Sequence, residues 1–133
     1  MSQVFADTSF YVAFVNPRDA MHSAAVNFVR RFRGNSVTTE CVLVEVGNWL
    51  ARSGDRDVFS DLLTSLRADP GTTIIEADHA LFEAGLALYS RRRDKTWSVT
   101  DCMSFAVMHQ RRLAEALTTD RHFTQAGFKT LLA

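Results

Sequence analysis

Short apolar runs alternate with longer amphipathic segments along this chain, and that alternation predicts its elements. The short runs, rich in apolar or β-branched residues, predict strands within residues 3–6, 34–38, 72–77 and 114–119, with a final strand or tail at 128–133. Apolar residues that recur every three or four positions predict helices directly after Asp7 and at 24–32, 40–52, 58–68, 79–93, 100–112 and 120–127. Such alternation is typical of an α/β fold whose mainly parallel sheet is covered on both faces.

Length and charge narrow the class of protein. The 133 residues suffice for one domain, so we predict a single domain over residues 1–133. Basic and acidic residues number 15 each, so any binding of nucleic acid must depend on local basic patches. The chain shows no signal-like start and no apolar run long enough to span a bilayer, so we expect a cytoplasmic protein without a membrane segment.

Four acidic residues stand where the predicted elements leave little room for a solvated carboxylate. Asp7 follows the first strand, and Asp120 stands where the fourth strand gives way to a helix. Asp101 opens a helix that is apolar nearly all round, and Glu45 shares a helix face with core-type residues such as Trp49. A buried charge without a partner costs several kcal/mol, so these positions need an explanation.

Each carboxylate also has a purely structural explanation. Asp7 and Asp120 could be helix N-caps, and Asp101 could form a capping box with Ser98. Glu45 could lie at the edge of the apolar helix face, where it would reach solvent or pair with an arginine. Taken together, however, junctions of this kind meet at the carboxyl edge of a parallel sheet. Carboxylates gathered there repel unless cations neutralise them, and all-oxygen ligands suit Mg²⁺ or Mn²⁺. Zinc is disfavoured because the histidines are scattered along the sequence.

Four segments resemble the PIN-domain ribonucleases, and in particular the single-domain VapC-type toxins. They read ADTSFYVA at 6–13, VTTECVLVEVGNWL at 37–50, WSVTDCMSFAVM at 97–108 and EALTTDRHFTQAGF at 115–128. The last two are the most specific, and the four occur in the family's order over essentially the whole chain.

The resemblance implies a fold, an activity and a cofactor. The fold is a three-layer α/β/α sandwich around a mainly parallel sheet of about five strands. The activity is metal-dependent cleavage of RNA with Mg²⁺ or Mn²⁺. The family's metal-binding acids fall on Asp7, Glu45, Asp101 and Asp120. The hydroxyl beside the last acid falls on Thr119, and Ser9 matches a hydroxyl after the first. We expect these two to complete the catalytic set by orienting a water or a phosphate oxygen.

The resemblance also implies partners. RNA would be drawn in by basic residues near the site, such as the run at 91–95 and Arg121, although such a run also suits a solvated helix end. Homodimers are usual in the family, and a cognate antitoxin peptide usually occupies the toxin's groove. Candidate groove residues, which suit the core equally well, are Phe10, Tyr11, Phe14, Val46 and Leu50. The alternative function is a non-catalytic PIN-like module that binds RNA or protein.

Overall fold

The computed structural model describes residues 2–132 and contains each of the predicted elements. The strands are β1 (Gln3–Ala6), β2 (Asn35–Thr39), β3 (Thr72–Ile75), β4 (Glu115–Leu117) and β5 (Lys129–Thr130). The helices are α1 (Thr8–Val15), α2 (His22–Arg31), α3 (Glu40–Arg52), α4 (Arg56–Ala68), α5 (His79–Arg91), α6 (Val99–Gln110) and α7 (Arg121–Gln125). Element ends differ from prediction by a few residues. Met1 and Ala133, which the predicted domain includes, lie outside the described residues.

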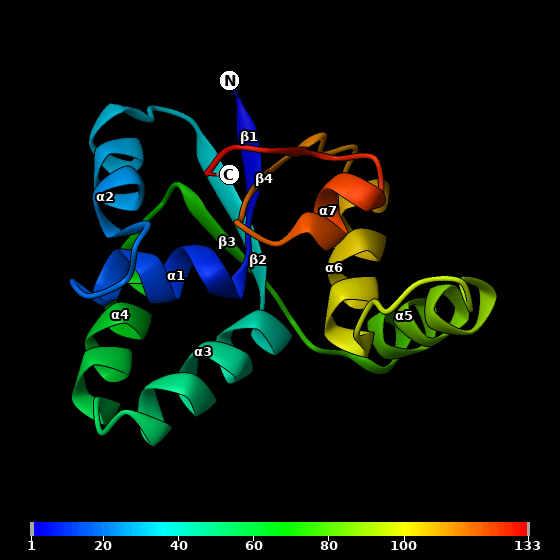
Figure 1. The fold of residues 1–133 in the computed structure, drawn as a ribbon, viewed down its shortest axis with the longest axis horizontal. Helices are drawn as coiled ribbons and strands as arrows, with labels where there is room; N and C mark the ends of the chain where they lie inside the picture. Colours follow the sequence, from blue (N-terminus) through cyan, green and yellow to red (C-terminus); the bar gives the residue numbers. More distant parts are fainter. Residues whose placement is uncertain (1, 133) are drawn as a thin grey trace.

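The strands form one sheet in the order β3-β2-β1-β4-β5, and each neighbouring pair is parallel. Parallel neighbours need crossover connections, and the helices supply them. Figure 1 shows α1, α2 and α4 on one side of the sheet and α5, α6 and α7 on the other. The predicted three-layer α/β/α architecture is therefore confirmed.

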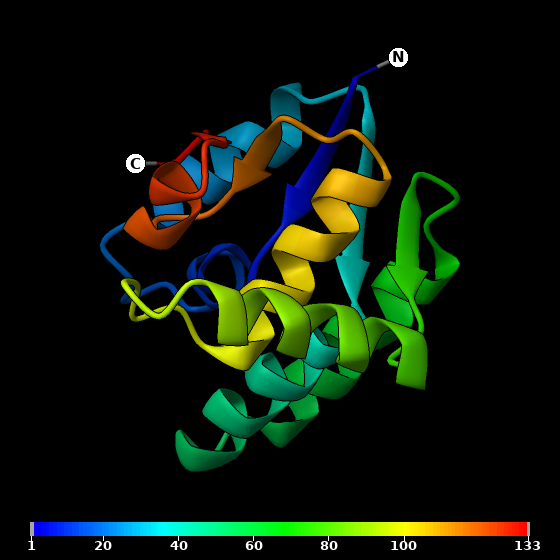
Figure 2. The same ribbon diagram turned by 90° about the vertical axis from the view of Figure 1, so that its right-hand side faces the viewer.

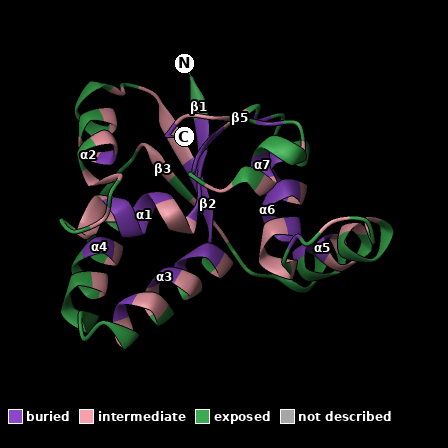
Figure 3. Cartoon of the chain, viewed as in Figure 1, coloured by how far each residue is buried: buried purple, intermediate pink, exposed green. Residues whose placement is uncertain are grey.

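The central strand shows why the chain needs helices on both faces. Successive residues of a strand point to opposite sides, yet Val4 and Phe5 of β1 are both almost fully buried. Figure 3 shows buried residues concentrated along the sheet and the inner sides of the helices. On one side, α5 packs closely on α6 because Gly85 faces Met103, where a Cβ would collide. Figure 2 shows these two helices crossing in front of the sheet.

The carboxyl ends of β1, β2 and β4 meet at one edge of the sheet. The Thr38 hydroxyl in β2 donates to the carbonyl of Ala6 in β1 at 2.8 Å. The backbone N–H of Asp7 donates to the carbonyl of Leu117 in β4 at 3.1 Å, which extends the pairing by one residue. Asp7 and the residues after Leu117 are therefore held side by side.

Among residues 2–132, no helix combines the length and apolar character needed to span a bilayer.

Candidate metal centre

One pocket at the carboxyl edge of the sheet brings the predicted site residues together. The six predicted residues that line it are Asp7, Ser9, Glu45, Asp101, Thr119 and Asp120. They come from four segments of the sequence, and the pocket has a volume of about 490 Å³. The prediction that these side chains would gather at one edge thus agrees with the geometry, while their chemical roles stay a prediction.

Asp7 is the buried member of the group, with 6% of its surface exposed. It occupies the N-cap position of α1, but its side chain accepts no capping hydrogen bond, so the N-cap explanation does not account for the carboxylate. Its Oδ2 instead accepts a hydrogen bond from the Thr118 hydroxyl at 3.0 Å. Burial raises the pKa of Asp7 from 3.8 to about 7; hydrogen bonds from Thr8 and Thr118 oppose the rise, and the charges of Asp101 and Glu45 add to it.

Glu45 is half-buried on α3 and faces the start of α1. The Thr8 hydroxyl donates to its Oε1 at 2.7 Å, which fixes the carboxylate toward the pocket. Within the described part of the chain, no arginine or lysine lies within 4.0 Å of Glu45, so the explanation by an arginine partner is not supported.

Asp101 forms the capping box that the sequence suggested. Its backbone N–H donates to Ser98 Oγ at 3.0 Å, and its Oδ2 accepts from the Ser98 backbone N–H at 3.1 Å. The same Oδ2 lies 2.9 Å from His122 Nδ1. The capping explanation and the site explanation are thus compatible, because these contacts use a single oxygen of the carboxylate.

Asp120 also combines a cap with a place in the pocket. Its Oδ1 accepts from the His122 backbone N–H at 2.9 Å, which caps α7 as the N-cap explanation proposed. Its own N–H donates to the Thr118 hydroxyl oxygen at 3.0 Å, and that hydroxyl lies 3.0 Å from Ser9 Oγ. Ser9 Oγ further accepts from the Thr119 backbone N–H at 3.0 Å. The 118–120 segment is therefore tied to the first turn of α1.

His122 and Thr118 are site residues that the sequence analysis missed. The histidines are scattered along the sequence, but the fold brings His122 Nδ1 to 2.9 Å from Asp101 Oδ2 and 3.5 Å from Asp120 Oδ1. One possible metal-ligand atom from each of Asp101, Asp120 and His122 lies within 4.8 Å of the other two. The spacing of Asp120 and His122 could have suggested this contact. Thr118 shows no such signal, because its bond to Asp7 depends on the pairing of β1 with β4.

The donor set fits a hard divalent cation. Five acidic residues line the pocket, namely the four predicted acids and Asp19 from the turn between α1 and α2. Burial and the charges of Asp101 and Glu45 all disfavour the ionised form of Asp7, and carboxylate oxygens are ligands that suit hard cations. A bound cation would favour the ionised form of Asp7 and relieve the repulsion among the acids. The chemistry of the side chains therefore supports metal binding at this edge.

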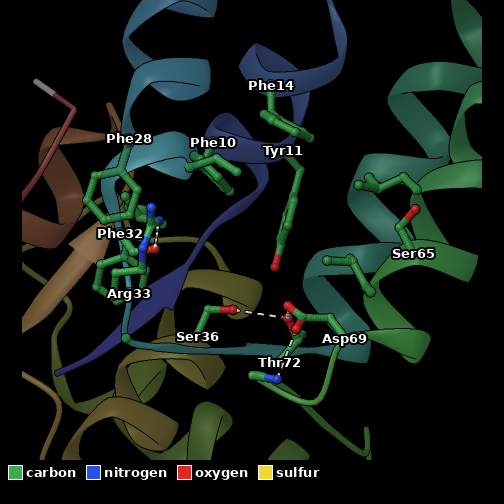
Figure 4. Close-up of a pocket in the computed structure, with 16 residues that line it drawn as sticks. Phe10, Tyr11, Phe14, Phe28, Phe32, Arg33, Ser36, Ser65, Asp69 and Thr72 are labelled. Carbon is green, nitrogen blue, oxygen red and sulfur yellow. Dashed lines mark hydrogen bonds between the residues drawn. The ribbon is translucent and has the colours of Figure 1, made fainter. Parts of the chain in front are cut away.

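A second pocket, of about 510 Å³, lies between α1, α2 and α4 (Figure 4), on the opposite side of the sheet from α5 and α6. Phe10, Tyr11 and Phe14 line it, as the predicted groove required. Val46 and Leu50 do not, and with 0% and 2% of their surfaces exposed they belong to the core. Of the five residues for which groove and core were both open, the three from α1 therefore line this pocket and the two from α3 belong to the core.

Comparison with known proteins places this geometry in a family. The PIN domain model matches residues 4–129. The chain is 30% identical over 129 residues to the 23S rRNA-specific endonuclease VapC20 of Mycobacterium tuberculosis, and the match covers 94% of this chain and 95% of that protein. The crystal structure of Mycobacterium tuberculosis VapC20, a sarcin-ricin loop cleaving toxin, superposes with a TM-score of 0.86 at 26% identity over 94% of this chain and 95% of that one.

Two more distant structures share the fold. A toxin–antitoxin complex from Klebsiella pneumoniae gives a TM-score of 0.63 at 16% identity and covers 89% of this chain and 87% of that one. FitAcB from Neisseria gonorrhoeae gives a TM-score of 0.67 at 16% identity and covers 96% of each chain.

Proposed function

The chain belongs to the PIN-domain family, and we propose that it is a metal-dependent endoribonuclease, the toxin of a VapC-type toxin–antitoxin pair. The observation that carries this proposal is the convergence of Asp7, Glu45, Asp101 and Asp120 on one pocket at the carboxyl edge of the sheet. The similarity to an endonuclease over nearly the whole chain supports it. RNA is the proposed substrate class, and 23S rRNA is the first substrate to test because the relative acts on it.

The four predicted acids of the pocket are the proposed metal ligands for phosphodiester cleavage. Asp7 and Asp101 hold the principal Mg²⁺ or Mn²⁺, and Glu45 and Asp120 complete its shell or hold a second ion. When bound, such an ion lowers the pKa of a water and stabilises the negative charge on the attacked phosphate.

Hydroxyl groups around the carboxylates hold the site in shape. Thr8 orients Glu45, and Thr118 orients Asp7 through the hydrogen bonds described above. Ser9 and Thr119 stand at the pocket surface, where their hydroxyls can position a water or a phosphate oxygen. In this proposal no side chain is a nucleophile, because the attacking group is water.

The purified protein should cleave RNA with Mg²⁺ or Mn²⁺, and the cleavage should disappear with EDTA or in Asp101→Asn. Gel analysis of total ribosomal RNA measures both losses, and the exposed Asp61→Asn of α4 is the matched control. Cleavage that persists in EDTA would contradict the proposal. An absence of both cleavage and Mn²⁺-dependent thermal stabilisation would support the alternative of a non-catalytic PIN-like module that binds RNA or protein.

An antitoxin segment is the proposed occupant of the pocket between α1, α2 and α4. Five aromatic side chains contribute to its lining, and Figure 4 shows the Tyr11 hydroxyl directed toward Asp69 across the pocket. A peptide with apolar side chains would suit such a lining.

Phe14→Ala should weaken binding of the antitoxin. Truncating an aromatic anchor in an interface typically costs about 2 kcal/mol, which is roughly a thirtyfold loss of affinity. The measurement is titration calorimetry with the product of a short reading frame adjacent to the gene. Phe82→Ala is the matched control, because Phe82 is 44% exposed on α5, away from this pocket. Equal losses in the two variants would contradict the assignment.

The proposal includes three further features of the protein in solution. Residues 1–133 form a single domain, which the single sheet of the described residues supports. The protein is a homodimer, as is usual for the family, and sedimentation equilibrium measures its mass. It acts in the cytoplasm, where its RNA substrate is found.

A further inference from the structure

A basic pocket lies beside the acidic one, in the segment that joins α5 to α6. Side chains that line it include Tyr89, Arg92, Arg93, Lys95, Thr96 and Trp97. Thr96 also lines the acidic pocket, so the two pockets adjoin. We propose that the basic pocket binds the sugar–phosphate backbone of the RNA strand next to the bond that is cut.

The segment is held in place by contacts that leave part of its charge free. Arg92 forms two hydrogen bonds with Asp94, at 3.0 and 3.1 Å, and its guanidinium lies 5.1 Å from the centre of the Trp97 ring. Trp97 in turn donates to the side-chain oxygen of Gln125, the last residue of α7, at 3.1 Å, and Figure 2 shows this segment beside α7. Arg92 and Trp97 are therefore engaged in holding the segment and are not free to bind a ligand.

Arg93 and Lys95 supply the available positive charge. Arg93 is exposed and forms no salt bridge within the described residues, while Lys95 Nζ lies 4.0 Å from Asp94, at the limit of an ion pair. Across the part of the chain that the structure describes, no acidic side chain lines this pocket. Its free charge is therefore positive, in contrast to the acidic pocket beside it.

RNA backbone is the ligand that explains the two pockets together. The acidic pocket repels phosphates, so a strand cut there must be held by cationic groups just outside it. The shared Thr96 allows one continuous strand to cross from the basic to the acidic pocket. Tyr89 is 49% exposed and offers a ring face for a base, whereas Trp97, at 5%, does not. The inference rests on the proposed function, because it names where the RNA is held.

Binding without metal tests the pocket separately from cleavage. Fluorescence anisotropy with a short labelled single-stranded RNA in EDTA gives affinities at several salt concentrations. At about 0.1 M salt, Arg93→Ala/Lys95→Ala should bind roughly 10- to 30-fold more weakly, and the slope of log K against log salt should become shallower by about 1.4, as expected for two lost phosphate contacts. The matched control is Arg30→Ala/Arg31→Ala at the exposed end of α2, which should bind like the wild type.

Tyr89 adds a contact of a different physical kind. Tyr89→Ala should weaken binding by about fivefold or more while leaving the salt slope unchanged, because base stacking releases no counterions. Tyr89→Phe keeps the ring and should retain the affinity. A salt slope that changes equally in all variants would overturn these assignments.

The outcomes separate this inference from the proposed function. If RNA binding depends on Arg93 and Lys95 but metal never produces cleavage, the pocket stands and the nuclease proposal fails. Equal affinities and slopes for wild type and Arg93→Ala/Lys95→Ala overturn the pocket even when cleavage is normal, and so does an absence of RNA binding by the wild type. The pocket would be assigned to an acidic peptide, and the inference overturned, if Arg93→Ala/Lys95→Ala lost binding of oligoglutamate while its binding of RNA stayed unchanged.

Discussion

Asp7→Asn should abolish RNA cleavage while leaving the fold intact. Losing a metal ligand removes several kcal/mol of transition-state stabilisation, so we expect cleavage to fall by about a thousandfold or more. The fold should survive because an asparagine oxygen can still accept the hydrogen bond from Thr118. Cleavage of ribosomal RNA with Mn²⁺ measures the first effect, and circular dichroism measures the second.

The same variant separates a lost ligand from a damaged fold. Thermal unfolding with and without Mn²⁺ should show that the wild type gains stability from the ion and that Asp7→Asn gains much less. Asp61→Asn makes the same chemical change at an exposed position and should keep both the activity and the response to Mn²⁺. Full metal-dependent cleavage by Asp7→Asn would show that Asp7 is not a ligand.

The sequence predicts this fold well because each element carries its own local pattern. The short run before Asp7 predicts strand β1, which the structure contains as Gln3–Ala6. The capping box of Ser98 and Asp101 predicts the start of α6, and the structure contains that capping box. Neither pattern depends on distant parts of the chain. The fold class follows from the order of such elements, since alternating strands and helices favour a parallel sheet.

Parts of the site that depend on tertiary packing were not predictable in the same way. The contact of His122 with Asp101 joins residues 21 apart in sequence, and the bond of Thr118 to Asp7 spans 111 residues. Asp19 also lines the acidic pocket, from the turn between α1 and α2, and nothing in its local sequence sets it apart. The helical pattern of α3 likewise could not tell a groove residue from a core residue, so both stayed open for Leu50, which the structure places in the core.

The metal-free protein should become less stable as the pH rises from about 4 to above 7, and Asp7 is the cause. In the unfolded chain this carboxyl ionises near 3.8, whereas in the fold burial raises its pKa to about 7. The unfolded state therefore releases the proton first. The stabilising contribution is complete below about pH 4 and is lost as the pH rises through 7, with a total of roughly 4 kcal/mol.

Urea denaturation in EDTA across this pH range measures the effect. Other groups titrate as well, so the quantity to follow is the difference in free energy of unfolding between wild type and Asp7→Asn. Asparagine cannot ionise, so at pH 8 the variant should be the more stable of the two by a few kcal/mol. Saturating Mg²⁺ should reverse that order, because the cation stabilises the ionised carboxylate that only the wild type offers. If the free energy of unfolding depended on pH in the same way for the two proteins in EDTA, the pKa of Asp7 would not be raised in the fold. The acidic pocket would then lack the unfavourable burial and repulsion that a bound cation is proposed to relieve.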